Sequence, residues 1–295
     1  MCASIPIATP PKPTTASSSP NGKWRWNSAG IGGATALDFL TKVRGVSFVE
    51  AVEILTGERA MSARSYQHTA KSKPSPEKRP LSLPKPVRYS SAVTSYLQDR
   101  GIHPAVVGKC VRAGTIYEAR NNGETVCVFV GKDDVGKARF ACMRGVRDKY
   151  HRDATGSDKR FSFRIPAADP DSGYLAVFES PIDALSHATL QINEGRVWDG
   201  HRLSLGGTSN VALLAFLERN PLIRHIDLCL DNDEAGQLAA KGIRSQIIAD
   251  ERFVRISVSI EPPKVGKDYN EALLHAVNLE REQKKQRRRE AAHSI

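Results

Sequence analysis

Carboxylates follow two apolar stretches of the chain, and their types and spacing are suited to holding a metal ion. The run YLAVF ends at Glu179, and the run HIDLCL ends at Asp231, with Asp233 two residues further on. Side chains two apart in an extended segment point the same way, so Asp231 and Asp233 can share one cation. Clustered carboxylates repel unless a cation neutralises them, and oxygen-only ligands favour Mg²⁺ or Mn²⁺ over zinc. The pattern predicts a divalent-metal site at Glu179, Asp231 and Asp233.

Single acids at strand ends also have a simpler interpretation, as solvated loop residues or helix N-caps. Two further segments argue against it here. SLGGTS places a Gly-Gly turn at Gly206 and Gly207, and the apolar run FVRISVSI leads to Asp268. Apolar runs followed by helical patterns are typical of buried parallel strands that feed crossover helices. In such sheets the site lies beyond the carboxyl ends of the strands, so we expect an α/β fold with a doubly wound parallel sheet.

These residues resemble the Toprim domain shared by DnaG-type bacterial primases, topoisomerases and small nucleases. The family pattern is a Glu after the first strand, a Gly-rich turn, a DxD pair after the third strand and a later acid. The similar residues here are Glu179, Asp183, Gly206, Gly207, Asp231, Asp233 and Asp268. Asn270 departs from the pattern, because primases usually carry an acid there, and this argues against a second metal ion. The resemblance implies a Toprim, Rossmann-like parallel sheet with flanking helices, and adds Asp183 and Asp268 to the candidate metal ligands.

The segment before the Toprim residues changes pattern to two helices and then several strands. Turns at 122–123 and 134–136 are hairpin signals, so an α+β subdomain is predicted. YLQDRGI and VFVGKDDVGKARFACMRG resemble the subdomain that precedes the Toprim core in primases. That resemblance implies that Arg144 and Lys159, with Arg160 beside them, bind nucleotide or nucleic-acid phosphates. The alternative is that these are solvated surface cations.

A small module precedes both the predicted α+β subdomain and the Toprim-like residues. Alternation of Trp24 and Trp26 with basic residues predicts a short strand, and helices are predicted at 36–43 and 48–56. The module resembles the last third of the primase zinc-binding domain, yet no Cys or His cluster precedes Trp24, so we expect no zinc. The tryptophans are suited either to stacking on bases or to packing in a small core.

Composition divides the chain further. Residues 1–20 and 70–88 are rich in Pro, Ser, Thr and Lys, which argues against packed structure. The predicted parts are a disordered tail at 1–20, a zinc-domain remnant at 21–60, a linker at 61–88, the α+β subdomain at 89–168, the Toprim domain at 169–280 and a basic C-terminal tail at 281–295.

Charge indicates the class of partner. The chain carries 43 Lys and Arg against 32 Asp and Glu, a net charge of +11. Such an excess favours polyanions and predicts salt-dependent binding, although a basic enzyme without such a partner remains the alternative. No apolar run approaches the roughly 20 residues that cross a bilayer, so no membrane association is expected. Five cysteines without a CxxC pair predict a reduced, cytoplasmic protein.

The resemblance implies a metal-dependent nucleic-acid enzyme that performs primase-like nucleotidyl transfer to a 3′ hydroxyl. Its cofactor would be Mg²⁺ or Mn²⁺, and its partners single-stranded DNA, nucleotides, and a helicase or relaxase encoded elsewhere. The arrangement is also similar to Toprim proteins carried by plasmids and conjugative transposons of Gram-positive bacteria, which implies replication or transfer of a mobile element. Two alternatives stay open, a metal-dependent nuclease and a non-catalytic nucleic-acid-binding protein, so the residues leave open whether the chain is an enzyme.

Overall fold

The computed structural model describes residues 16–18, 24–26, 31–33, 35–44, 46, 51, 54–55, 79–88 and 91–293. The chain forms two compact units, Met1–Ser75 and Pro76–Ile295, and each is described by itself. Among the described residues, every helix is too short or too polar to cross a membrane.

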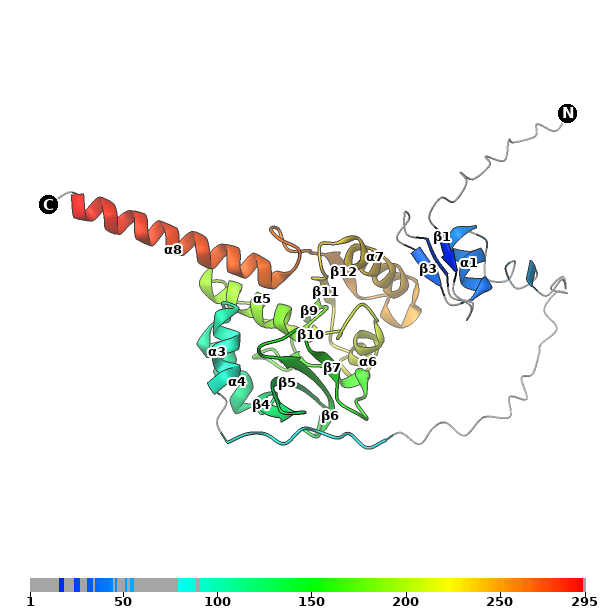
Figure 1. The fold of residues 1–295 in the computed structure, drawn as a ribbon, viewed down its shortest axis with the longest axis horizontal. Coiled ribbons are helices and arrows are strands. Elements are labelled where there is room, and N and C mark those ends of the chain that lie inside the picture. The colour runs from blue at the N-terminus through cyan, green and yellow to red at the C-terminus, as the bar shows by residue number, and fades with distance from the viewer. Residues whose placement is uncertain are drawn as a thin grey trace, which may run out of the picture. The chain divides into compact units, whose positions relative to one another are not determined.

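The first unit contains a small antiparallel sheet with the strand order β1-β2-β3, followed by helix α1 (Figure 1). Its elements are β1 (Ala16–Ser18), β2 (Trp24–Trp26), β3 (Ile31–Gly33) and α1 (Ala36–Val43). The strand and helix predicted at 24–26 and 36–43 are therefore confirmed, whereas most of the helix predicted at 48–56 lies outside the described residues. Trp24 packs edge-on against Phe39 with ring centroids 5.2 Å apart, which gives this tryptophan a packing role.

The predicted disordered tail was wrong at Ala16–Ser18. These residues form β1, which pairs antiparallel with the whole of β2, from Ala16 opposite Trp26 to Ser18 opposite Trp24. The physical reason is that a two-stranded β2-β3 ribbon leaves the backbone N–H and C=O groups of β2 unpaired on one side, and an added strand satisfies them.

The second unit begins with an α+β subdomain, as predicted. Helices α3 (Ser91–Asp99) and α4 (Pro104–Arg112) precede a four-stranded antiparallel sheet in the order β4-β5-β6-β7. The strands are β4 (Ile116–Asn121), β5 (Glu124–Lys132), β6 (Ala138–Gly145) and β7 (His151–Asp153). The turn between β4 and β5 has positive φ at both Asn122 and Gly123, which is the conformation that favours an Asn-Gly pair in a two-residue hairpin.

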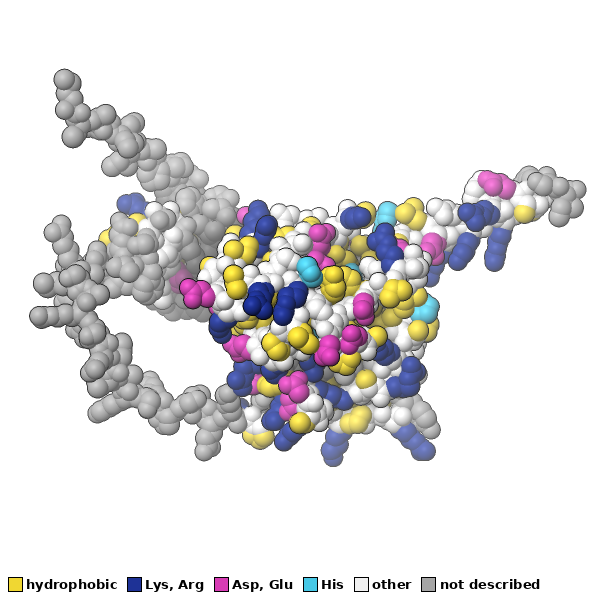
Figure 2. Space-filling model, turned by 180° about the vertical axis from the view of Figure 1, so that it is seen from behind, with side chains coloured by type: hydrophobic (Ala, Val, Ile, Leu, Met, Phe, Trp, Pro, Cys, Tyr) yellow, Lys and Arg dark blue, Asp and Glu magenta, His cyan; other side chains and the backbone are white. Residues whose placement is uncertain are grey.

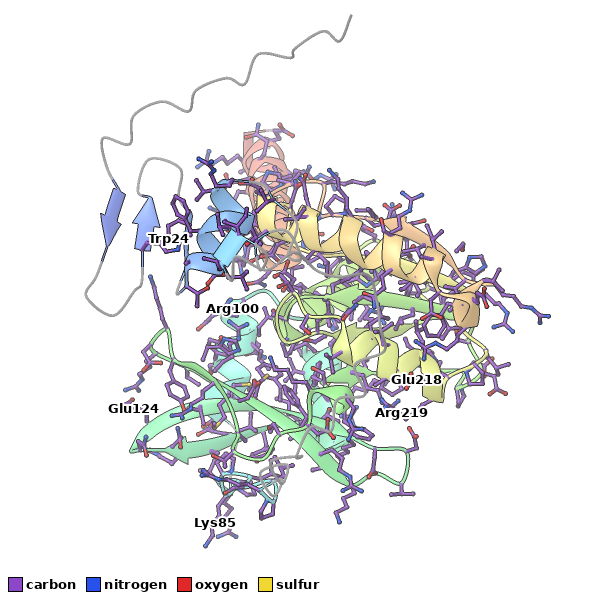
Figure 3. The ribbon with its side chains drawn as sticks, turned by 90° about the vertical axis from the view of Figure 1, so that its right-hand side faces the viewer. Trp24, Lys85, Arg100, Glu124, Glu218 and Arg219 are labelled. Carbon is purple, nitrogen blue, oxygen red and sulfur yellow. The ribbon has the colours of Figure 1, made fainter. Side chains whose placement is uncertain are left out.

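Residues 79–88, the end of the predicted linker, lie against this sheet (Figure 3, where Lys85 marks the segment). Val87 donates its backbone N–H to Glu118 over 2.9 Å, and the Tyr117 hydroxyl donates to the carbonyl of Pro84 over 2.9 Å. The prolines of this segment do not prevent such contacts, because their carbonyl groups still accept hydrogen bonds. The remainder of the predicted linker lies outside the described residues.

The segment that resembles a Toprim domain forms a five-stranded sheet in the order β12-β11-β9-β10-β8, in which only β8 runs antiparallel to its neighbour. Its strands are β8 (Arg164–Ile165), β9 (Tyr174–Phe178), β10 (His201–Ser204), β11 (His225–Leu228) and β12 (Ser257–Ile260). Its helices are α5 (Pro181–Asn193), α6 (Val211–Arg219), α7 (Glu234–Ala249) and α8 (Tyr269–His293), with single turns η2 (Lys159–Phe161) and η3 (Glu251–Phe253). The expected α/β class with a parallel sheet and flanking helices is confirmed.

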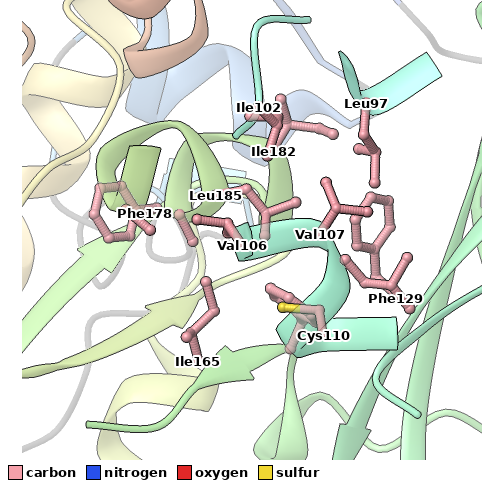
Figure 4. Close-up of a cluster of buried hydrophobic side chains, with 14 of the residues drawn as sticks. Leu97, Ile102, Val106, Val107, Cys110, Phe129, Ile165, Phe178, Ile182 and Leu185 are labelled. Carbon is pink, nitrogen blue, oxygen red and sulfur yellow. The ribbon is translucent and has the colours of Figure 1, made fainter. Parts of the chain in front are cut away.

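Alternation along β9 shows how the sheet is covered on both faces. Leu175 and Val177 face a core built with α6 and α7, whereas Ala176 and Phe178 face a second core. The second core also contains α5, Leu273 of α8, and side chains of the α+β subdomain (Figure 4). Because both parts of the second unit bury side chains in this one core, the subdomain is held firmly against the Toprim sheet.

Asn270, the departure from the primase pattern, reinforces this junction. It is buried, and its amide group donates to the carbonyl of Arg100 over 2.8 Å and to the Ser186 hydroxyl over 3.1 Å. Its amide oxygen accepts a hydrogen bond of 3.1 Å from the Arg100 guanidinium. A carboxylate could accept from Arg100 but could not donate, which explains why an amide suits this position.

We therefore expect Asn270→Asp to destabilise the second unit, by about 1–3 kcal/mol, because the carbonyl of Arg100 loses its donor and a carboxylate replaces a buried neutral amide. Urea denaturation of the variant and the wild type measures the effect. Asn278→Asp, an exposed change on the same helix, is the matched control and should lie within about 0.5 kcal/mol of wild type. Equal losses in both variants would contradict the assigned role of Asn270.

Candidate active-site cleft

The sheet order brings the ends of its parallel strands to one cleft. Glu179 follows β9, the Gly206–Gly207 turn follows β10, Asp231 follows β11, and Asp268 follows β12. β9 lies between β10 and β11, so Glu179 is central. The cleft has a volume of about 320 Å³. Its lining comprises Arg100, Arg144, His151, Glu179, Ser180, Pro181, Ile182, Asp183, Gly206, Gly207, Asp231, Lys267, Asp268 and Asn270.

Glu179 and Asp231 are directly linked. The backbone N–H of Asp231 donates to Oε1 of Glu179 over 3.2 Å, which orients the glutamate toward the end of β11. Burial raises the pKa of Glu179, and the neighbouring Asp231 carboxylate raises it further. Burial is also the main cause of the raised pKa of Asp231. Both groups therefore hold their protons more tightly than free carboxylic acids do.

The pKa of Asp233 is shifted in the opposite direction, because this residue caps helix α7. Its Oδ1 accepts the backbone N–H of Gly236 over 2.8 Å. This hydrogen bond, together with Lys267, lowers the pKa of Asp233, so its charged form is favoured.

Gly236 is a site residue that the sequence pattern did not single out. A Cβ at this position would overlap the carbonyl oxygen of Asp231 and lie 2.8 Å from Oε1 of Glu179. A side chain here would force the first turn of α7 away from both acids. The available signal was the glycine three residues after the capping Asp233, where helix propensity alone disfavours it.

Lys267 is the second site residue that was missed. Its ammonium group lies 3.4 Å from Oδ2 of Asp231 and 3.1 Å from Oδ2 of Asp233. Asp231 and Asp233, which were predicted to share a cation, therefore share the ammonium group of Lys267. The repulsion expected among the acids is relieved from within the chain. The signal in the sequence was its position directly before Asp268.

The two remaining candidate acids have local hydrogen-bonding roles. Asp183 is buried and accepts a hydrogen bond of 2.6 Å from the Ser180 hydroxyl. Burial, with Asp268 and Asp231 adding to it, raises the pKa of Asp183 to about 7. Asp268 accepts the backbone N–H of Glu271 over 2.8 Å at the start of α8. Each of these roles is compatible with a capping interpretation, and both side chains still line the cleft.

Whether the site can bind a metal ion depends on how the carboxylate oxygens of the candidate acids are arranged. Across the described residues, no group of three or more His, Cys, Asp or Glu side chains is placed as a metal-binding cluster. The donor chemistry nevertheless fits a hard cation, because Asp231 and Asp233 already bracket the ammonium of Lys267. A divalent ion would occupy the same position only after Lys267 moved away.

The basic candidates are placed differently from one another. Arg144, on β6, lines the cleft, and its Nε atom is buried without a hydrogen-bond partner among the described residues. Lys159 donates to the carbonyl of Gly206 over 3.2 Å, which places its ammonium at the glycine turn. Arg160 is paired with Asp158 over 2.6 Å and is not among the residues that line the cleft.

Arg100 and His151 also line the basic side of the cleft, although neither was singled out from the sequence. Arg100 directly follows α3, and its guanidinium lies over the ring of Tyr96, 4.9 Å from its centroid. Burial and the nearby Arg144 charge lower the pKa of His151, so its neutral form is favoured. The cleft thus has an acidic wall from the Toprim sheet and a basic wall from the α+β subdomain.

Comparisons with known proteins agree with this division of the second unit. Residues 176–273 match the family described as Toprim-like. Residues 95–169 match a family described only as a protein of unknown function, DUF3991. A search of curated proteins finds no match.

Solved primase structures are also similar to this chain. The primase fragment of the bacteriophage T7 primase-helicase protein is 23% identical, with 61% of this chain and 69% of that one covered and a TM-score of 0.44. The E. coli primase catalytic core is 16% identical, with 61% and 67% covered and a TM-score of 0.43. A DnaG primase catalytic domain bound to single-stranded DNA is 15% identical, with 67% and 75% covered and a TM-score of 0.43.

The raised pKa of Asp183 predicts a pH dependence of stability. In the unfolded chain its pKa should lie near 3.8, so between about pH 4 and 7 the folded protein keeps a proton that the unfolded chain has lost. Stability should therefore fall as pH rises through this range, by about 1.4 kcal/mol per unit of pKa difference. Asp183→Asn has no such proton, so its stability should change less between pH 5 and 7. Urea denaturation at pH 5 and pH 7 measures the change in the free energy of unfolding, with the exposed Asp171→Asn as control. An equal change in wild type and Asp183→Asn would contradict the prediction.

Proposed function

We propose that this chain is a Toprim-class enzyme acting on nucleic acid, with primase-like nucleotidyl transfer as its reaction. The observation that carries the proposal is the pairing of opposite walls in one cleft. Glu179 and Asp231 line it from the sheet, while Arg100 and Arg144 line it from the subdomain. Phosphoryl transfer needs cationic groups around the phosphate oxygens and acids that can hold a metal ion beside them.

Mg²⁺ or Mn²⁺ is the proposed cofactor, and Asp231 and Asp233 are its proposed main ligands, with Glu179 beside them. Asp183 and Asp268, which also line the cleft, are proposed as further ligands. When bound, the ion would neutralise phosphate charge and lower the pKa of an attacking hydroxyl. Zinc is not proposed, because hard carboxylate oxygens do not favour it.

The chain's own residues would position the substrate. Arg144, whose buried Nε has an unused donor, would hold a phosphate, and Lys159 would present its ammonium beside the glycine turn. Arg160 would act only if its pair with Asp158 opened. Glu179, with its raised pKa, is suited to accepting or releasing a proton close to the reacting hydroxyl.

Single-stranded DNA and nucleotides are the proposed ligands. The net charge of +11 supports a polyanionic partner. A separately encoded helicase or relaxase and a role in a mobile element are proposed on the resemblance alone. The origin of the first unit from a primase zinc-binding domain is also proposed on that resemblance. A cytoplasmic location is proposed because the five cysteines include no CxxC pair.

One assay tests the reaction class. The protein is incubated with labelled nucleotides, a single-stranded DNA template and Mg²⁺ or Mn²⁺, and products are resolved on a denaturing gel and complexes on a native gel. Extension supports the proposal, and it should vanish in Asp231→Asn. Cleavage would instead identify a nuclease, and a mobility shift without either product would identify a binding protein.

Metal binding should raise the thermal midpoint, because a ligand that binds only the folded state stabilises it by about 2.7 kcal/mol at a hundredfold excess over Kd. Both Asp231→Asn and Asp233→Asn should lose most of this shift. Without metal they should differ: Asp231→Asn removes a carboxylate whose charge is disfavoured and should be no less stable than wild type, whereas Asp233→Asn removes a favoured charge and should melt lower. Thermal melts with and without millimolar metal measure both effects. An undiminished metal shift in both variants would contradict the assignment.

Arg144→Ala should weaken binding of single-stranded DNA without unfolding the protein. Loss of one phosphate contact should reduce the slope of log affinity against log salt by about 0.7 on single strands. Lys159→Ala should show the same change, whereas the exposed Arg255→Ala, which removes an equal charge outside the cleft, should not. Fluorescence anisotropy over a salt series provides the slopes. Unchanged slopes for both Arg144→Ala and Lys159→Ala would remove the basic wall from the proposal.

A further inference from the structure

The backbone of Lys267 is fixed on both sides. Its N–H donates to Oε2 of Glu271 over 2.8 Å, and its carbonyl accepts the N–H of Asn232 over 2.6 Å. Asn232 stands between the two aspartates, so Lys267 is tied to the loop that carries them. The preceding Gly266 has φ +81°, and a Cβ there would lie 2.7 Å from the Cβ of Glu271. Only a glycine allows this tight approach without strain.

The side chain of Lys267 is held much less firmly than its backbone. It is 53% exposed, and among the described residues its ion pairs, at 3.4 and 3.1 Å, are with Asp231 and Asp233. Four rotatable side-chain bonds let its ammonium move while the backbone stays in place. The same side chain lines the cleft that Arg144 also faces.

A divalent ion and this ammonium cannot occupy the space between the aspartates together, because both are cations competing for the same oxygens. Entry of the metal therefore requires the ammonium to leave. Its fixed backbone keeps the displaced ammonium near the cleft, where an anion that enters with the metal would attract it in addition to the other carboxylates that line the cleft.

We propose that Lys267 is a displaceable internal cation. In the metal-free protein it neutralises Asp231 and Asp233, and when a divalent ion enters it turns to a phosphate group of the bound nucleotide or nucleic acid. This inference rests on the proposed metal-dependent function of the same cleft. It adds a consequence: Lys267 disfavours binding of metal alone and favours binding of metal together with a polyphosphate.

The test compares Lys267→Met, which keeps most of the length but removes the charge, with Lys267→Arg, which keeps the charge. Lys264→Met, an exposed change on the same loop, is the control. Mn²⁺ affinity is measured by calorimetry, first with metal alone and then with a non-hydrolysable nucleoside triphosphate analogue. Circular dichroism checks that each variant is folded.

With metal alone, Lys267→Met should bind Mn²⁺ at least about fivefold more tightly than wild type, and its metal-free form should melt lower. The triphosphate should raise the Mn²⁺ affinity of wild type more than that of Lys267→Met. Lys267→Arg and Lys264→Met should stay close to wild type. Equal or weaker Mn²⁺ binding by a folded Lys267→Met overturns the inference while leaving the metal function intact. Absence of Mn²⁺ binding in wild type and every variant overturns both this inference and the proposed metal-dependent function. Mn²⁺ binding by Lys267→Met but not by wild type supports the inference.

A separate feature, the second half of α8, carries an independent inference. Residues 278–292 are all exposed. At 100° per residue, one face of about 140° contains five cations, and the acids of this segment lie outside it. These cations are Arg281, Lys284, Lys285, Arg288 and Arg289. Figure 2 shows Lys and Arg side chains along one side of the projecting helix and an acid on the other.

We infer that this basic face binds the phosphate backbone of duplex nucleic acid. Residues 278–292 include no aromatic side chain on which an unpaired base could stack, and single-strand binding commonly depends on such stacking. A membrane surface is disfavoured for a related reason, since this part of the helix has no apolar face to bury in lipid. Regular cations along a helix suit a regular array of phosphates.

The test replaces Arg281, Lys285 and Arg288 with Gln in the full chain. The control replaces Lys241, Arg244 and Arg255, which are also exposed, and so removes the same charge elsewhere. Duplex DNA binding without metal is measured over a salt series by anisotropy. The slope should fall by about 2.7 in the α8 variant and change little in the control. Equal slopes in the two variants, or wild-type binding to anionic vesicles but not to DNA, would overturn the inference. Because no metal is present, the result is separable from the proposed catalytic function.

Discussion

Negative charge gathers where the parallel strands end, and the arrangement of the cleft depends on how that charge is balanced. Glu179 and Asp231 are partly buried beside one another, so each holds its proton more tightly than a free acid does. Asp233 is charged at the start of α7, where the backbone N–H of Gly236 favours it. The Lys267 ammonium completes the balance by pairing with both aspartates. A cleft built in this way can exchange one cation for another without a change of fold.

The second constraint is the firm junction between the Toprim sheet and the subdomain before it. Their apolar side chains share one core, and Asn270 adds hydrogen bonds from α8 to Arg100 and Ser186. The basic wall and the acidic wall are therefore held together by packed side chains and hydrogen bonds. Preorganised charges of opposite sign suit a reaction in which charge on a phosphate must be stabilised without reorganising the protein.

The sequence predicted much of this fold because the informative signals are local. Apolar runs that end at Glu179 and Asp231 correctly placed two strands and the acids that follow them, and the Asn122-Gly123 pair correctly placed a hairpin. The capping role of Asp233 was also among the interpretations of that acid. The signal failed at Ala16–Ser18, where pairing with β2 outweighs a composition typical of disorder. Composition describes the average of a segment, and strand pairing depends on what lies beside it.

The sequence by itself determined the class of the fold and named the acids that are proposed to hold a metal, because hydrophobic periodicity and the chemistry of side chains are properties of the chain alone. Only the tertiary structure decided which of these residues meet. It brought Lys267 between Asp231 and Asp233, buried Asp183 enough to raise its pKa to about 7, and separated Arg144 in the cleft from Arg160 outside it. Burial, ion pairing and backbone approach all depend on groups far apart in the chain, and no local pattern contains those distances.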